Sequence, residues 1–316
     1  MRTRNLVLSV AALTCVLSTA AYALGGSLQT RRLSTPSPSA SSPEADHHDH
    51  DATPTPSPSA ASQQAAGLPA GATDANDRLA KSPRHGEWAV IRSGSDSIRA
   101  WVVYPERRDK APVVLVIHEI FGLSNWIRAV ADQLAADGFI AIAPDLLTMK
   151  DVPRAADGES DAAAARAVIG QLDGATRDRY LLAVADWGMK LPAALPKYGV
   201  VGFCWGGSAS FSHAIASPTL GASVVYYGGS PGHATLGPVR APVLGLYGGS
   251  DARVNASIPP ADSAMKALGK TFEPHIFDGA GHGFLRQQDG QEGKNMEATR
   301  QAWPLTVAWF RKHLGA

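Results

Sequence analysis

Residues 198–211 read YGVVGFCWGGSASF, and this stretch decides how the rest of the chain is interpreted. An apolar run from Val200 to Phe203 leads directly into Cys204 and then stops at a glycine pair. Such a run is typical of a strand that is buried on both faces. Residues 202–206, GFCWG, match the G-x-S-x-G pattern of a nucleophile at a sharp strand-to-helix turn, with cysteine in place of serine. The flanking glycines fit this prediction, because larger side chains would collide at such a turn.

The sequence on both sides of this stretch alternates between strand and helix patterns. The segments EWAVIRS and SIRAWVVYP, separated by GSDS, predict an antiparallel hairpin. Further strands are predicted at APVVLVIHEIFG, FIAIAPDLL, GASVVYYGG, APVLGLYGGSD and TFEPHIFDG. Helices are predicted at 161–172, 175–191 and 295–313, and between Ser124, which would cap its helix, and Gly138, which would stop it. This alternation predicts an α/β fold, with a mostly parallel sheet and helices on both faces.

The elbow pattern also predicts two helper residues further along the chain, an acid and then a histidine. Asp251 follows a predicted strand at a glycine-rich turn, and His282 lies between glycines in the loop FDGAGHGF. As alternatives, Asp251 would serve as a helix cap or turn residue and His282 as an ordinary loop residue. His213 fits less well, because it lies in the helix after Cys204 and is expected to pack or to face solvent. The order Cys204, Asp251, His282 favours a catalytic triad.

From about Pro83 to the C-terminus, the chain resembles the dienelactone hydrolases, a cysteine branch of the α/β-hydrolase fold. The resemblance is carried by HEIFG at 118–122, APDLL at 143–147, GFCWGG at 202–207, and GHGF at 281–284 with a following arginine. It implies a hydrolase of ester or enol-lactone bonds that acts on a small molecule through a thioester on Cys204. No metal or organic cofactor is expected.

The resemblance also implies roles for residues around the thiol. Glu119 is expected close to the resting thiol, where like-charge repulsion would keep Cys204 neutral until substrate arrives; capping of the following helix is the alternative. The backbone N–H of Trp205 follows the nucleophile and is expected in the oxyanion hole, and the resemblance supplies Ile120 as the second donor.

Substrate contacts are implied as well. Arg286 matches the arginine that holds a substrate carboxylate in relatives, a task suited to a planar guanidinium. Tyr227, with Tyr226, resembles a tyrosine pair that lines the relatives' pockets, although ordinary packing is an equal alternative. Relatives have a second arginine before the elbow; here that region matches poorly, and Arg166 is a weak candidate. This departure leaves the substrate itself open.

The N-terminus bears on the cellular location of the protein, and the charge balance bears on its binding partners. Residues 1–23 are predicted as a signal peptide, since two arginines precede an apolar stretch that ends in an A-x-A-like site. A signal anchor is the alternative, and lipid attachment at Cys15 fits less well. Lys and Arg total 29 against 28 for Asp and Glu, which predicts neither nucleic-acid binding nor attraction to a membrane surface. We expect a monomer that is exported to the periplasm or secreted, without stable membrane association after cleavage.

Residues 24–80 are predicted as a disordered linker, because Ser, Pro and Ala dominate and few large apolar side chains are present. The hydrolase domain is then 81–316. Within the linker, DHHDHD at 46–51 would at most bind metal weakly. Three other functions remain open: a general carboxylesterase or thioesterase, a non-catalytic thiol redox or binding module, and a metal-handling protein.

Overall fold

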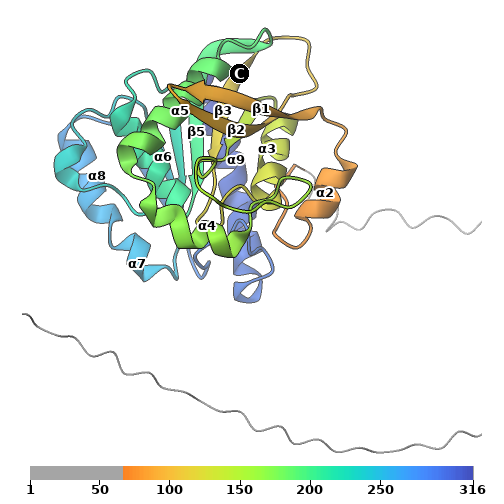
Figure 1. Ribbon diagram of the computed structural model, residues 1–316. Coiled ribbons are helices and arrows are strands. Elements are labelled where there is room, and N and C mark those ends of the chain that lie inside the picture. The colour runs from red at the N-terminus through yellow and green to blue at the C-terminus, as the bar shows by residue number, and fades with distance from the viewer. Residues whose placement is uncertain (1–66, 316) are drawn as a thin grey trace, which may run out of the picture. The chain divides into compact units, whose positions relative to one another are not determined.

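The computed structural model describes residues 67–315, which contain a single eight-stranded sheet (Figure 1). The predicted signal peptide, the DHHDHD tract and most of the predicted linker lie outside the described residues. The strands are β1 (Gly86–Ser93), β2 (Asp96–Val103), β3 (Ala111–Ile117), β4 (Ile140–Pro144), β5 (Ala194–Phe203), β6 (Ala222–Tyr226), β7 (Val243–Gly248) and β8 (Phe272–Phe277).

The sheet is mostly parallel and has the order β1-β2-β4-β3-β5-β6-β7-β8. The predicted hairpin is confirmed, because β1 and β2 pair antiparallel, with Ser93 opposite Asp96 at the turn. β2 also pairs antiparallel with β4, and the remaining neighbours are parallel. Since the carboxyl ends of β3, β5, β7 and β8 lie at one edge, the loops that follow these strands meet there.

Helices cover both faces of the sheet, as predicted. The α-helices are α2 (Ala75–Lys81), α3 (Asn125–Ala136), α4 (Ala162–Val168), α5 (Gly174–Gly188), α6 (Trp205–Ala216), α7 (Ala252–Asn255), α8 (Ile258–Ala267) and α9 (Lys294–Leu314). Short 3₁₀ turns lie at η1 (Ile169–Gln171), η2 (His233–Thr235) and η3 (Gln291–Gly293). The predicted cap of α3 is confirmed: Ser124 Oγ accepts the N–H of Ile127, and Gly138 follows the helix with φ +102°.

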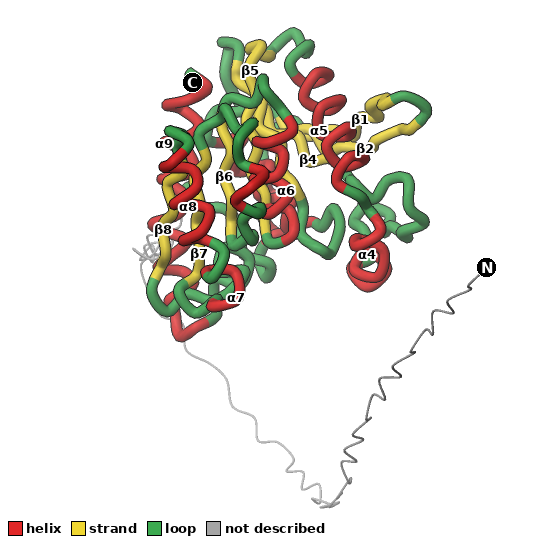
Figure 2. Tube along the Cα trace, turned by 90° about the vertical axis from the view of Figure 1, so that its left-hand side faces the viewer, coloured by secondary structure: helices red, strands yellow, loops and turns green. Residues whose placement is uncertain are grey.

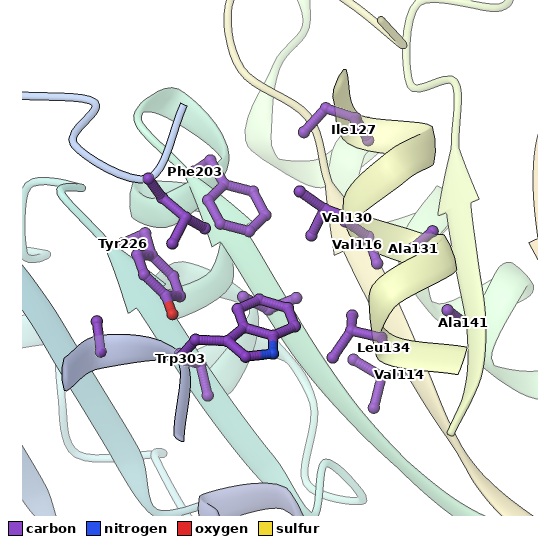
Figure 3. Packing of buried hydrophobic residues seen from close by; sticks show 14 of the residues in the cluster. Val114, Val116, Ile127, Val130, Ala131, Leu134, Ala141, Phe203, Tyr226 and Trp303 are labelled. Carbon is purple, nitrogen blue, oxygen red and sulfur yellow. The ribbon is translucent and has the colours of Figure 1, made fainter. Parts of the chain in front are cut away.

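Alternate residues of β3 supply the two hydrophobic cores. Val114 and Val116 pack with α3 and α9 on one face, where Trp303 and Phe203 are buried (Figure 3). The other face of β3 presents Val113, Leu115 and Ile117, which pack with residues of α5, α6 and α8. Figure 2 shows α6 next to β6 and α8 next to β8. The complete burial of β3 on both faces explains its uninterrupted apolar sequence.

The folded part of the chain begins earlier than the predicted domain boundary at residue 81. Leu68 and Ala70 are buried, and the carbonyl oxygen of Ala70 accepts the indole N–H of Trp126 at 2.9 Å. Helix α2 follows and lies against α3 (Figure 1). Long-range contacts fix this segment, which composition alone assigned to the linker. Among residues 67–315, no helix combines the length and apolar character needed to cross a membrane.

Candidate active site

Cys204 occupies a strained turn between β5 and α6. Its φ of 56° lies in the left-handed region, which non-glycine residues rarely adopt. The neighbouring glycines are required by close approach: a Cβ on Gly202 would lie 1.9 Å from the carbonyl oxygen of Gly206. A Cβ on Gly206 would lie 2.5 Å from the carbonyl oxygen of His118. The start of α6 therefore packs directly on the end of β3, and the predicted elbow geometry is present.

The three residues of the predicted triad lie together, although they come from three separate loops. His282 Nε2 lies 3.1 Å from Cys204 Sγ, and His282 Nδ1 lies 2.5 Å from Asp251 Oδ2. The other carboxylate oxygen of Asp251 accepts the N–H of Val254 at 3.3 Å, so Asp251 also caps α7. The sequence left open whether Asp251 is the acid of the triad or a helix cap. In the structure the same side chain contacts His282 and also caps α7.

The surroundings of Cys204 favour the neutral thiol. Burial raises its pKa, and the negative charge of Glu119 raises it further. The backbone N–H of Trp205 and the positive charge of Arg253 act in the opposite direction, with smaller effects. Arg253 was not singled out in the sequence, although it stands two residues after Asp251.

Glu119 is almost completely buried and forms an ion pair with Arg286. Its Oε2 lies 3.0 Å from Nε of Arg286, whose N–H is not aimed at that oxygen. Burial raises the pKa of Glu119 to about 7, and the arginine offsets this only in part. Glu119 does not cap α3, because Ser124 does so. The carboxyl group therefore titrates near neutral pH within electrostatic reach of the thiol.

Arg286 lies at the edge of the site with its guanidinium over the ring of Phe121, at 5.0 Å from the ring centre. Its side chain is 26% exposed. Within residues 67–315, its terminal Nη atoms donate no hydrogen bond, although the guanidinium is ion-paired with Glu119 through Nε.

Trp205 and Ile120, the two predicted oxyanion donors, pack in the same part of the structure. Trp205 and Ile120 both pack against the small cluster around Leu147, next to the elbow. In the described part of the chain, neither backbone N–H is used in a backbone hydrogen bond. The N–H of Trp205 lies close enough to the sulfur of Cys204 to act on its pKa, and the role of both N–H groups as oxyanion donors stays a prediction.

His118 is a site-supporting residue that the sequence interpretation missed. It is fully buried, its Nδ1 lies 2.7 Å from the carbonyl oxygen of Glu119, and its Nε2 accepts the N–H of Leu146 at 3.3 Å. Burial lowers its pKa, which keeps the ring neutral. His118 thereby fixes the backbone of Glu119 beside the elbow. In the sequence it stands at the end of a buried strand and begins the HEIFG motif, but that motif was used only to place Glu119 and Ile120.

The remaining candidates are not brought into an open site. Tyr227 is completely buried and packs its ring edge-on against His282, with ring centres 5.2 Å apart, so it supports the histidine and does not line an open pocket. Tyr226 is buried and its hydroxyl bonds to Thr306. Arg166 is exposed on α4. His213 is buried and hydrogen-bonded to Tyr198, so of the two positions expected for it, packed or facing solvent, the structure shows the packed one.

No group of three or more His, Cys, Asp and Glu side chains suited to a metal ion occurs within residues 67–315. The acidic and histidine-rich tract at 46–51 lies outside this range, so its weak metal binding stays a prediction.

The sheet order, the two helical layers and the elbow between β5 and α6 define an α/β-hydrolase fold. The sequence profile of the Dienelactone hydrolase family matches residues 98–314. A Salmonella typhimurium protein named "Putative carboxymethylenebutenolidase" is 32% identical over 241 residues, which cover 71% of this chain and 86% of that protein. The structure titled "Putative Dienelactone Hydrolase" from Klebsiella pneumoniae has a TM-score of 0.64 and 27% identity, over 72% of this chain and 98% of that one.

The chain belongs to the dienelactone hydrolase family and is a hydrolase. The family comparison begins at residue 98, so the ordered segment that precedes β1 lies outside the matched region.

Proposed function

We propose that this protein hydrolyses carboxylic esters or enol lactones with Cys204 as the nucleophile, His282 as the general base and Asp251 as the residue that orients the histidine. The observation that carries the proposal is the unbroken chain of contacts from Cys204 Sγ through the two ring nitrogens of His282 to Asp251 Oδ2. A thiol, an imidazole and a carboxylate in this arrangement form an activated nucleophile.

In the first half-reaction, the Sγ–H proton passes to His282 Nε2 and the thiolate sulfur bonds to the substrate carbonyl carbon. The carbonyl oxygen becomes an oxyanion that accepts hydrogen bonds from the backbone N–H groups of Trp205 and Ile120. Such a donor typically contributes about 3 kcal/mol of transition-state stabilisation. The carbon–oxygen bond to the leaving group then breaks, and the leaving oxygen takes the proton from His282. A thioester on Cys204 remains.

In the second half-reaction, a water molecule gives a proton to His282 Nε2 and its oxygen bonds to the thioester carbonyl carbon. The carbon–sulfur bond breaks, the acid product departs, and Cys204 recovers its proton from the histidine. Thiolate is a good leaving group as well as a nucleophile. The enzyme therefore favours activated esters and enol lactones, and ordinary amides are poor substrates.

Glu119 and Arg286 give the proposed enzyme a preference for anionic substrates. At rest, the buried Glu119 helps to keep the thiol neutral, a state that resists oxidation. The Nη atoms of Arg286, which donate no hydrogen bond within residues 67–315, suit a substrate carboxylate. A carboxylate bound there competes with Glu119 for the guanidinium charge and so alters the charge next to the thiol.

The test is turnover of p-nitrophenyl acetate and of a dienelactone by the wild-type chain, Cys204→Ala and Cys204→Ser. We expect the alanine variant to lose turnover of both substrates, and the serine variant to retain a small fraction because the elbow and histidine stay in place. Full activity of Cys204→Ala would overturn the mechanism. A strong preference for p-nitrophenyl acetate over the lactone would instead favour a general carboxylesterase.

We also propose that the protein is exported, on the strength of the basic and apolar sequence of residues 1–23 and the A-x-A-like step at its end. The monomeric state expected from the sequence is a separate proposal. Cell fractionation with mass determination of the mature N-terminus tests the export, and size-exclusion chromatography with light scattering tests the oligomeric state. An unprocessed chain in the membrane fraction would favour the signal-anchor alternative.

A further inference from the structure

A cavity of about 300 Å³ opens beside Arg286. Cys204 and His282 are not among its lining residues. Arg286, which is paired with Glu119 and lies over the ring of Phe121, is the residue that the cavity shares with the candidate site. Its walls come from four parts of the chain: the N-terminal segment with Ala72 and Ala75, the loop and first turn of α3, the start of α4 with Ala162, and the loop that carries Arg286.

The N-terminal wall is held in place by hydrogen bonds to the loop of Arg286 and to α3. The backbone N–H of Ala72 donates to the carbonyl oxygen of Arg286 at 2.8 Å. Gln288 Nε2 donates to the carbonyl oxygen of Pro69 at 3.0 Å, and Trp126 Nε1 donates to that of Ala70 at 2.9 Å. These bonds use backbone atoms of residues 69–72. The wall is therefore a fixed part of the fold, and its side chains can be changed without removing the bonds.

The charges around the cavity favour an anion at one end only. Arg286 is the only basic residue among those that line the cavity, and its Nη atoms donate no hydrogen bond within residues 67–315. The opposing carboxylate, Glu159, already accepts hydrogen bonds from the backbone N–H of Asn125 at 2.9 Å and from its Nδ2 at 3.1 Å. Because Glu159 is satisfied at the start of α3, a helix N-terminus that favours negative charge, it does not require a cationic ligand.

The rest of the lining is largely apolar. Ala72, Ala75, Ala162, Phe121 and Trp126 contribute small methyl groups and aromatic rings. A cavity of about 150 Å³ lined by apolar side chains is enough to hold a benzene ring, and small-molecule pockets begin at about 300 Å³. The cavity beside Arg286 therefore has room for a ring and a short linker to the anionic group.

We propose that this cavity is a substrate subsite that takes the apolar, preferably aryl, substituent of a carboxylate-bearing ester or lactone, with the N-terminal segment as its outer wall. The inference rests on the proposed function, since it names the substrate class of the same site. It assigns residues 69–76 a part in specificity, although they precede the region that the family profile matches. The carboxylate binds the Nη atoms of Arg286 and the ring lies between Ala72 and Ala162.

Direct binding tests the subsite without any requirement for turnover. Calorimetry on the full chain carrying Cys204→Ala gives the Kd values of 2-phenylsuccinate and succinate, which differ by one aryl group. We expect phenylsuccinate to bind at least about tenfold more tightly, which corresponds to about 1.4 kcal/mol from burial of the ring. Ala72→Trp and Ala162→Trp fill the cavity from two segments that are distant in sequence, and each should remove this preference.

Two exposed alanines outside the cavity, Ala80 in α2 and Ala163 in α4, supply matched controls. Ala80→Trp and Ala163→Trp should keep the preference for phenylsuccinate. Equal affinity for both ligands in the parent chain, or an unchanged preference in Ala72→Trp and Ala162→Trp, would overturn the subsite. If binding follows the expected pattern while wild-type protein and Cys204→Ala have the same esterase rate, the subsite stands and the proposed mechanism falls.

Discussion

Oε2 of Glu119 and Nε of Arg286 lie 3.0 Å apart, although the two residues are distant in sequence. The contact joins the end of β3 to the loop that follows β8, directly beside Cys204. Burial nevertheless raises the pKa of Glu119 to about 7. The pair therefore changes its net charge within the physiological pH range, and this change acts both on stability and on the thiol.

The stability of the fold should depend on pH through Glu119. The folded protein holds the proton of this group up to about pH 7, whereas the unfolded chain releases it near the ordinary value of 4.5. The contribution of the protonated Glu119 to the free energy of unfolding is therefore complete below about pH 4.5 and is lost as the pH rises through about 7. The shift corresponds to at most about 3 kcal/mol. Urea unfolding of wild type and Glu119→Gln at about pH 5 and pH 8 measures it. Between these two pH values the wild type should lose more of its free energy of unfolding than Glu119→Gln. Equal losses would contradict the raised pKa of Glu119.

The thiol of Cys204 should react slowly with alkylating agents at neutral pH, because burial and Glu119 raise its pKa. Glu119→Gln removes the second cause and should move the alkylation profile toward lower pH. Iodoacetamide labelling, followed by mass spectrometry of the peptide that contains Cys204, separates this thiol from Cys15. A profile that is unchanged or displaced to higher pH in Glu119→Gln would show that the carboxylate does not act on the thiol.

Replacing Arg286 should affect anionic substrates selectively. Arg286→Gln should raise KM for mono-4-nitrophenyl succinate by about tenfold or more, the loss expected for one charge-assisted hydrogen bond. The KM for the uncharged p-nitrophenyl acetate should change much less. Arg300 is exposed on α9, and Arg300→Gln provides a control for the loss of one positive charge. A similar rise in KM for both esters would remove the carboxylate-binding role from Arg286.

Asp251 contacts both His282 and the first turn of α7, and two substitutions separate these contacts. Asp251→Asn should lower kcat by about 10²- to 10⁴-fold, because an amide cannot hold the histidine as a carboxylate does. Its side-chain oxygen can still cap the helix. Asp251→Ala should show a similar loss of kcat and an additional loss of about 1 kcal/mol in the free energy of unfolding. If the two variants unfold at the same urea concentration, the cap contributes nothing.

Most of the fold was predictable because its signals are local. The apolar runs that became β3, β4, β5 and β6 are buried on both faces, and Ser124 and Gly138 bound α3 as their residue types suggest. The order of Cys204, Asp251 and His282 was sufficient to anticipate that these side chains meet.

The features that could not be predicted from the sequence depend on contacts between residues that are distant in the chain. Leu68 and Ala70 belong to a segment whose composition predicts a linker, and only their packing against α3 and the loop of Arg286 orders them. The burial of Tyr227 behind His282 likewise depends on how β6 ends against the loop after β8. The pairing of Glu119 with Arg286 is a third example, since no local pattern links them.

The most direct test of the proposed mechanism is detection of the acyl-enzyme on Cys204. The full chain is mixed with excess p-nitrophenyl acetate, quenched in acid during turnover, digested, and analysed by mass spectrometry. The mechanism predicts an acetyl group on the peptide that contains Cys204, together with loss of turnover in Cys204→Ala. Turnover that continues in Cys204→Ala, or an acetyl group found only on another residue, would contradict it.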